Sequence, residues 1–303
     1  MQQTLEQLIE ACYSLTGEGN CAEYIPLLAE VNPKQLAIAI ITHDHQVYQA
    51  GDYQALFTLQ SISKIFALAL AVMDQGEAKV FDRVGMEPTG DPFNSIYKME
   101  IFSYEKPLNP MINAGAMVVT SMIKGRTAQE KVERLLALLR EMTGNPKIDM
   151  VEEVYQSEME HANRNRALAY YLKELGLIED VEATLEAYIR QCAIQVTCED
   201  MARMGLCLAR YGVTDRGTPL IPTAISKMLK TFMVTCGMYN SSGEFAIKVG
   251  IPAKSGVSGG ILAAVPNRMG IGVFGPALDR KGNSVAGVKL LEELSKRFDL
   301  SIF

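Results

Sequence analysis

The residues best suited to chemistry are Ser61 and Lys64, in the tetrapeptide Ser61-Ile-Ser-Lys64. They are three positions apart, so their side chains share one face of a predicted helix. The apolar run 65–73 continues that helix on all sides, which predicts burial. Burial lowers the pKa of a lysine, and a neutral Lys64 could accept the proton of Ser61. The pair would then act as nucleophile and base without a histidine, and the helix N-terminus would stabilise a developing oxyanion.

A plainer interpretation makes Ser61 a simple N-cap and Lys64 a side chain that extends to solvent, and the tetrapeptide alone favours it. A second motif shifts the balance. Lys254-Ser255-Gly256 lies between two predicted strands. It resembles the K-[ST]-G triad that serine β-lactamases and penicillin-binding proteins carry on a sheet-edge strand. Those proteins also begin a buried helix with S-x-x-K and have a helical subdomain between the two motifs.

The elements that must position these motifs can be predicted from apolar periodicity. Predicted strands cover residues 35–42, 46–51, 245–249, 261–265 and 271–274, and predicted helices include 4–14, 127–143, 163–175, 180–192, 197–212 and 284–298. We expect an α+β fold of the β-lactamase/transpeptidase-like type, with a mainly antiparallel sheet flanked by helices and an inserted all-helical subdomain. Residues 1–60 and 225–303 would form a discontinuous sheet subdomain, and residues 61–224 the helical subdomain, together one catalytic unit.

The composition excludes several other classes of protein. The chain has 303 residues, 48% of them hydrophobic, and a net charge of −6, which argues against disorder and against nucleic-acid binding. Only three histidines are present, and six cysteines form no C-x-x-C pair, which is typical of a reducing compartment. The sequence shows neither a signal peptide nor an apolar run long enough to span a membrane, so we expect a soluble, cytoplasmic protein.

Three motifs invite other interpretations. Residues 256–260 match G-x-S-x-G, but a strand-like run follows and no histidine occurs beyond His161, so a nucleophile elbow is disfavoured. Residues 270–275 match G-x-G-x-x-G, but no helix opens there, and a glycine-rich strand fits better. His43-Asp44-His45 could ligate a metal, but a solvated turn is favoured. The sequence therefore predicts neither a metal ion nor an organic cofactor.

A more detailed resemblance covers nearly the whole chain, from about Tyr24 to Ser284. The segments that carry it are Glu23-Tyr-Ile-Pro26, Leu59-Gln-Ser-Ile-Ser-Lys64, Asn109-Pro-Met-Ile-Asn-Ala-Gly-Ala116, Ser157-Glu158, Arg164-Asn165, Val196-Thr-Cys-Glu199, Cys236-Gly-Met-Tyr239, Pro252-Ala-Lys-Ser-Gly-Val257 and Gly282-Asn-Ser284. They resemble the corresponding segments of the serine-dependent glutaminases, which hydrolyse L-glutamine to L-glutamate and ammonia.

The resemblance implies roles for individual residues in the reaction. Ser61 would attack the side-chain amide carbon and form a γ-glutamyl ester, with Lys64 as the base. Tyr239 would relay a proton to the departing ammonia, and Tyr188 would line the site beside it. The backbone N–H groups of Ser61 and Val257 would form the oxyanion hole.

The resemblance also implies how the two ends of a free amino acid are bound. Glu158 would pair with the α-ammonium group, and Asn113, Asn165 and Tyr24 would hold the carboxylate. Gln60, beside the nucleophile, belongs with these substrate-binding residues. Glu158 and Asn165 are seven positions apart, so they would face the same way on one continuous helix. A site that pairs both ends discriminates strongly against analogues that lack a group.

Plainer interpretations stay open for several of these residues. Tyr188 lies on an apolar stripe and could be a core residue only, and Glu158 lies in an acidic run that would form a solvated face. Asn113 lies in an apolar stretch, where a buried amide must be hydrogen-bonded. At the level of function, a β-lactam-reactive serine enzyme and a non-catalytic amino-acid-binding module are the alternatives. The expected partners are L-glutamine and further copies of the chain, as a homo-oligomer (tetramer or dimer), with neither nucleic acid nor membrane.

Overall fold

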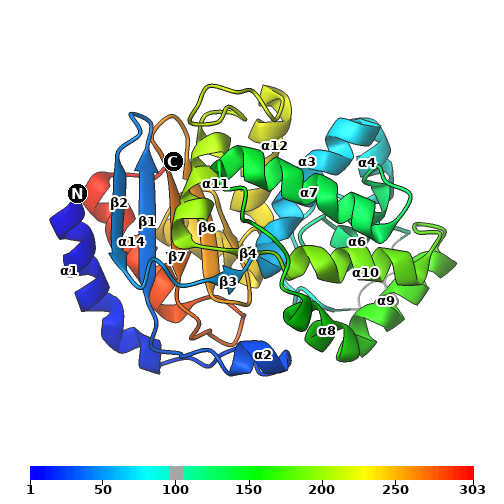
Figure 1. Ribbon diagram of the computed structural model, residues 1–303, viewed down its shortest axis with the longest axis horizontal. Coiled ribbons are helices and arrows are strands. Elements are labelled where there is room, and N and C mark those ends of the chain that lie inside the picture. The colour runs from blue at the N-terminus through cyan, green and yellow to red at the C-terminus, as the bar shows by residue number, and fades with distance from the viewer. Residues whose placement is uncertain (96–104) are drawn as a thin grey trace.

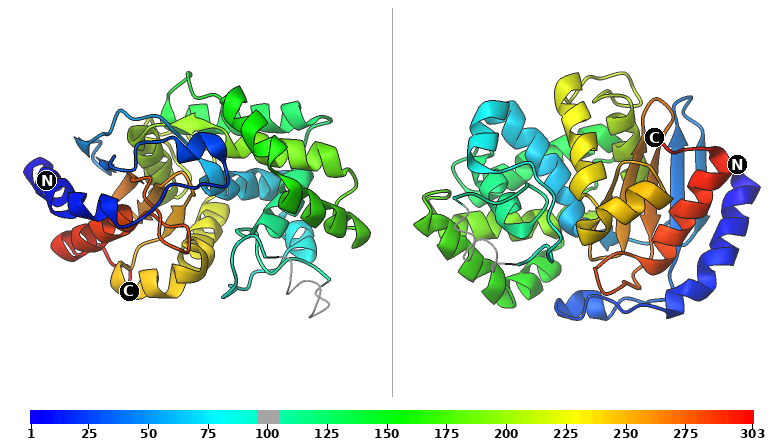
Figure 2. Two further views of the ribbon diagram at one scale, coloured as in Figure 1. Left: turned by 90° about the horizontal axis from the view of Figure 1, so that it is seen from below. Right: turned by 180° about the vertical axis from the view of Figure 1, so that it is seen from behind.

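A computed structural model describes residues 1–95 and 105–303 of the chain. Its elements form a sheet-containing layer at one end and a layer of helices at the other (Figure 1). Both termini lie at the sheet end of the molecule, as all three views show (Figure 2). The expected α+β class is therefore confirmed.

The main sheet has five antiparallel strands in the order β2-β1-β7-β6-β5. The strands are β1 (Ala37–Thr42), β2 (Val47–Gly51), β5 (Ala253–Ser255), β6 (Gly260–Val265) and β7 (Met269–Phe274). The predicted hairpin of residues 35–51 is present, and β1 joins the C-terminal strands through β7, with Ala37 opposite Phe274. The two ends of the chain thus build one sheet, as the sequence predicted. A separate two-stranded pair, β3 (Phe57–Thr58) with β4 (Gln195–Val196), leads into the site.

Helices cover both faces of the main sheet, because its strands carry apolar side chains on both sides. Ile38 and Ile40 of β1 pack into a core with three helices formed by the chain ends, α1 (Gln2–Tyr13), α13 (Ser242–Lys248) and α14 (Val285–Phe298). The alternate residues Ala37, Ala39 and Ile41 belong to the core of the opposite face. This alternation is the period-two pattern of a strand buried on both sides.

The helix α11 (Cys198–Ala209) lies directly on that opposite face, against β7, β6 and β1. Gly270 and Gly272 make this packing possible, since a β-carbon at either position would collide with the backbone of α11. The G-x-G-x-x-G match is therefore a glycine-rich strand, as predicted. The division of the chain into subdomains at 61–224 stays a prediction, but α11 falls within that range and packs mostly against the sheet.

The remaining helices form the second layer and surround a core of their own. They are α3 (Ser63–Gln75), α4 (Glu77–Arg83), α6 (Asn113–Met122), α7 (Ala128–Thr143), α8 (Glu152–Glu160), α9 (Asn163–Glu174), α10 (Val181–Cys192) and α12 (Thr223–Cys236). Shorter pieces are α2 (Pro26–Ala29) and the 3₁₀ turns η1 (Ser14–Gly17), η2 (Gln60–Ile62) and η3 (Tyr239–Ser241). The core of this layer is continuous with the α11 side of the sheet.

One predicted strand is wrong. Residues 245–249 lie in and just after the helix α13, and the third C-terminal strand is Ala253–Ser255 instead. Phe245 and Val249 are four positions apart and buried, while Ile247 between them is 88% exposed. This spacing buries one face of a helix, and a strand would have brought Ile247 to the same face as its buried neighbours.

Candidate active site

Ser61 lies where the sheet layer meets the helical layer. It is the middle residue of the turn η2, which runs directly into α3, so it precedes the helix rather than opening it. The residue before it, Gln60, is buried and has φ of +47°, the left-handed region that side chains other than glycine seldom adopt. Such backbone strain is typical of functional sites, where the surrounding structure holds it in place.

Lys64 is fully buried one turn further along. Its Nζ donates hydrogen bonds to the carbonyl of Met111 at 3.1 Å and to Oδ1 of Asn113 at 2.7 Å. Burial lowers the pKa of Lys64 to about 8, against the opposite effect of Cys192 and Glu158. The interpretation of Lys64 as a side chain that extends to solvent is therefore wrong, and a neutral amine is accessible near physiological pH.

Tyr239 approaches Ser61 from the sheet side. It too has a left-handed backbone, with φ of +54°, and its ring packs on Phe93 with the centroids 4.7 Å apart. Burial raises the pKa of the phenol above its ordinary value, while the neighbouring Ser61 hydroxyl lowers it. The phenol therefore stays protonated and able to donate. Lys254 lies beneath the ring, with its Nζ 4.5 Å from the centroid, on the edge strand β5 as its motif predicted.

A cavity of about 260 Å³ lies beside Ser61, large enough for one amino acid. Eight of the ten predicted site residues line it: Tyr24, Gln60, Ser61, Asn113, Glu158, Asn165, Tyr188 and Val257. Lys64 and Tyr239 lie immediately outside the lining and touch it through Asn113 and Phe93. The structure thus brings together residues from the N-terminal segment, the helical layer and the edge of the sheet.

Glu158 is the carboxylate of this cavity. It is only 9% exposed, and its Oε2 accepts a hydrogen bond from Nε2 of Gln60 at 3.3 Å. Burial raises its pKa to about 7, while Gln60 and Lys64 lower it. The alternative of a solvated acidic face is wrong for this residue, although Glu152 and Glu153 on the same helix are exposed.

The expected continuous helix between Glu158 and Asn165 is wrong. Glu158 lies on α8 and Asn165 on α9, and the chain breaks at His161 and Ala162. Both side chains nonetheless line the cavity, one from each helix. Asn113 connects Lys64 to Asn165. Its Oδ1 accepts a hydrogen bond from Lys64 Nζ, and its Nδ2 donates to Asn165 Oδ1 at 3.0 Å.

Tyr188 is both a core residue and a residue of the site, the two interpretations that the sequence left open. It is buried in the apolar core, and it lines the cavity with its ring centroid 5.8 Å from Lys64 Nζ. Burial raises the pKa of its phenol well above the ordinary value.

Sequence reasoning did not assign site roles to six further residues that line the cavity: Phe93, Asn94, His161, Ala162, Arg164 and Cys192. Two carried a usable signal, since Arg164 precedes Asn165 and Cys192 follows Tyr188 by one helical turn. Phe93 and Asn94 lie outside any helix or strand, where periodicity gives no signal.

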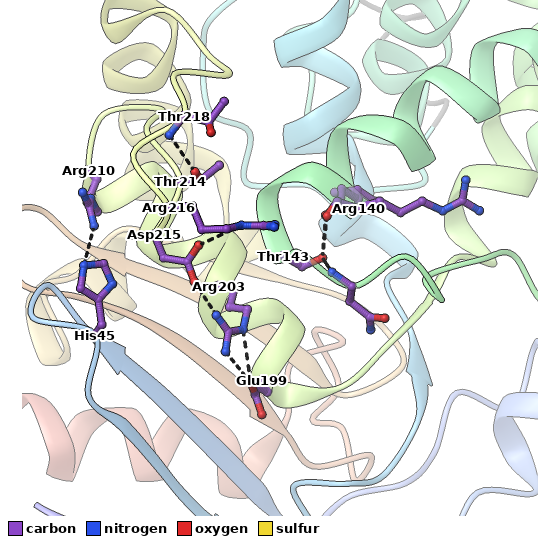
Figure 3. Close-up of polar contacts among 12 residues, drawn as sticks. His45, Arg140, Thr143, Glu199, Arg203, Arg210, Thr214, Asp215, Arg216 and Thr218 are labelled. Carbon is purple, nitrogen blue, oxygen red and sulfur yellow. Dashed lines mark hydrogen bonds and ion pairs between the residues drawn. The ribbon is translucent and has the colours of Figure 1, made fainter.

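The competing motifs do not have the structures that their alternative functions require. Residues 256–260 connect β5 to β6, and a strand follows them, so they form no nucleophile elbow. His45 lies on the β1–β2 turn, with its Nε2 3.4 Å from an Arg210 guanidinium nitrogen, a neighbour that disfavours a bound cation (Figure 3). Within residues 1–95 and 105–303, no group of three His, Cys, Asp or Glu side chains is arranged to hold a metal ion.

A serine that lines a small cavity, one helical turn from a buried lysine of lowered pKa, is typical of a hydrolase that forms an acyl-enzyme. Comparison with known proteins agrees and is more specific. The sequence model of the glutaminase family matches residues 19–303. Curated relatives include a glutaminase of Geobacillus thermodenitrificans, 58% identical over 100% of this chain and 98% of its own length, and one of Clostridium tetani, 54% identical over the full length of both. The chain belongs to the glutaminase family, amidohydrolases that act on glutamine.

Solved structures extend this likeness to the fold. A probable glutaminase from Bacillus subtilis, complexed with 6-diazo-5-oxo-L-norleucine, has a TM-score of 0.92 at 44% identity and covers 100% of this chain and 97% of its own. Another Bacillus subtilis glutaminase structure, 43% identical with the same TM-score and covering 100% and 99%, is a covalent complex with 5-oxo-L-norleucine. That complex formed by reaction of the relative with 6-diazo-5-oxo-L-norleucine.

Proposed function

We propose that this chain hydrolyses L-glutamine to L-glutamate and ammonia through an ester on Ser61, with Lys64 as the base. The observation that carries the proposal is Lys64 itself, fully buried, with a pKa lowered to about 8 and held one turn from a serine that lines the cavity. A lysine in that state is a base at the pH of the cell.

The steps follow from the positions of these groups. Ser61 Oγ attacks the side-chain amide carbon as Lys64 accepts its proton, and the backbone N–H groups of Ser61 and Val257 stabilise the oxyanion. The C–N bond then breaks, and Tyr239 donates a proton to the leaving nitrogen and recovers one from Lys64. Water attacks the resulting γ-glutamyl ester, releases L-glutamate and restores Ser61. The protonated, raised-pKa phenol of Tyr239 supports its role as a donor.

The polar groups of the cavity suit the two ends of the substrate. Glu158 would pair with the α-ammonium group, and that pairing would hold the carboxylate ionised against the effect of burial. Asn113, Asn165 and Tyr24 would bind the α-carboxylate, and Gln60 orients Glu158 through its hydrogen bond. Tyr188 would close the wall beside the reacting amide.

Three broader proposals concern the fold, the cellular compartment and the oligomeric state. The S-x-x-K segment leading into the buried α3, the Lys254 motif on the edge strand and the helical layer between them favour a β-lactamase/transpeptidase-like fold. All six cysteines are free, which favours a cytoplasmic protein. In the part of the chain that the structure describes, no helix has the length and apolarity to cross a membrane. We further propose a homo-oligomer, a dimer or tetramer, as the resemblance to the family implies.

The proposed function is tested by ammonia release from a panel of amides that contains L-glutamine, L-asparagine and non-amino-acid amides. We expect turnover of L-glutamine. Calorimetric binding of L-glutamine without ammonia release would indicate a non-catalytic binding module instead. Acylation of Ser61 by a labelled penicillin, with no amide hydrolysis, would indicate a β-lactam-reactive enzyme.

A further inference from the structure

Arg164 is a cation at the cavity that makes no ion pair with the residues that the structure describes. It lies in the first turn of α9, is exposed, and lines the same cavity as Ser61 and Glu158. Over residues 1–95 and 105–303 it makes neither an ion pair nor a hydrogen bond. Two positions later on the same helix, Arg166 forms an ion pair with Glu182 at 3.5 Å and does not line the cavity.

The negative group of the cavity and the groups that can donate hydrogen bonds lie on different helices. Glu158 supplies the negative group. Lys64 Nζ donates to Asn113 Oδ1, and Asn113 Nδ2 in turn donates to Asn165 Oδ1, so Asn165 already accepts one hydrogen bond and its Nδ2 can donate to a ligand. Asn165 and Arg164 both line the cavity from the first turn of α9, while the Glu158 carboxylate lies on α8.

This separation matches the two charges of a free α-amino acid. We propose that Arg164 is a specificity-determining residue that recognises the α-carboxylate of the substrate, together with Asn165. A cavity with Glu158 alone, in a chain of net charge −6, would repel that carboxylate. The positive charge of the Arg164 guanidinium offsets this repulsion, and the group can present two parallel N–H donors to a carboxylate. The enzyme would thereby select free glutamine over glutamine whose carboxyl group is blocked. The inference rests on the proposed function.

The test compares Arg164→Gln with the matched control Arg166→Gln, which removes the same charge from the same helix. Two substrates are used, L-glutamine and its α-methylamide, which lacks the carboxylate charge and releases ammonia only from its side chain. We expect Arg164→Gln to lower kcat/KM for L-glutamine about fivefold, through KM, as for a charge pair at a partly exposed site. The α-methylamide should react at the same rate with Arg164→Gln and with Arg166→Gln. Arg166→Gln should keep the wild-type kcat/KM for L-glutamine, and Arg164→Lys should recover part of the loss seen in Arg164→Gln.

Binding gives a readout that does not depend on turnover. In calorimetry, Arg164→Gln should bind L-glutamate more weakly than the wild type does, while its binding of the α-methylamide should be unchanged. The wild-type preference for L-glutamate should also fall as salt rises, because salt screens an exposed charge. An equal loss for both compounds, or no loss at all, would overturn the role of Arg164. If wild-type protein shows the expected binding pattern and releases no ammonia, the proposed function fails while the role of Arg164 stands.

Discussion

Ser61 and Lys64 beside the cavity can be compared with a second buried serine–lysine pair within one helical turn, Ser226 and Lys230 on α12, which lies away from that cavity. Burial lowers the pKa of both lysines to about 8. Lys230 even makes the hydrogen bond that suggests a catalytic pair, with its Nζ 3.1 Å from Ser226 Oγ.

The second pair differs in what surrounds it. Ser226 Oγ and Lys230 Nζ both donate to the carbonyl of Leu208, and the Lys230 Nζ lies 4.2 Å from the ring centroid of Tyr211. The two hydrogen bonds supply donors to a backbone carbonyl near the C-terminus of α11. Neither Ser226 nor Lys230 lines the cavity beside Ser61. The comparison teaches that a buried lysine of low pKa is not by itself a base in catalysis. It also needs a nucleophile that a substrate can reach.

The largest expected difference between the two pairs is in turnover after loss of the hydroxyl. Ser61→Ala should lower kcat about 10⁴-fold or more, as removal of other catalytic serines does. Ser226→Ala should leave kcat close to that of the wild type and lower stability by about 1–3 kcal/mol, because Lys230 loses a partner. Ammonia release and urea unfolding measure the two effects. Substantial turnover by Ser61→Ala would contradict the assignment of the nucleophile.

Replacement of each lysine sharpens the same contrast. Lys64→Met should lower kcat by about 10²–10⁴-fold, the usual contribution of a positioned base. Lys230→Met should retain activity. Both variants remove a hydrogen bond to a buried carbonyl group, so both should lose stability, and stability alone would not explain a loss of activity confined to Lys64→Met. A similar loss of kcat in the two variants would remove the distinction.

The pH dependence of kcat/KM gives the smallest but most detailed effect. The proposed mechanism requires that Glu158 and Lys64, with pKa values of about 7 and about 8, are both deprotonated in the free enzyme. Log kcat/KM should therefore rise with pH, with a slope of about two below the first pKa and about one between them, and level off above the second. Glu158→Gln should remove one of the two steps. A profile that falls from pH 6 to pH 8 would contradict a neutral Lys64.

Local features of the fold were predictable because local sequence determines them. The hairpin of residues 35–51 is present, and the helices capped by Asp180 and Thr197 begin where expected, although the second ends at Ala209, three residues before its expected end. The errors occurred where tertiary contacts decide. An apolar run such as 245–249 fits a strand or a helix until its burial pattern is known, and nothing local shows that α11 lies across the sheet.

The site shows the same limit. Ser61, Lys64 and Lys254 lie in recognisable motifs, whereas Glu158 is indistinguishable from its exposed acidic neighbours in sequence. Glu158 is buried near the end of α8, and periodicity did not reveal that α8 and α9 are separate helices. The resemblance to a family identified Glu158, and the structure supplied the physical reason for its raised pKa.

The most direct test of the account is to react the protein with 6-diazo-5-oxo-L-norleucine and locate the adduct by peptide mass spectrometry. We predict a single 5-oxo-L-norleucine adduct on Ser61, formed much more slowly in Lys64→Met and at the wild-type rate in Lys230→Met. An adduct on Ser63 or Cys192, or labelling of Lys64→Met at the wild-type rate, would contradict the assignment of Ser61 as nucleophile and Lys64 as its base.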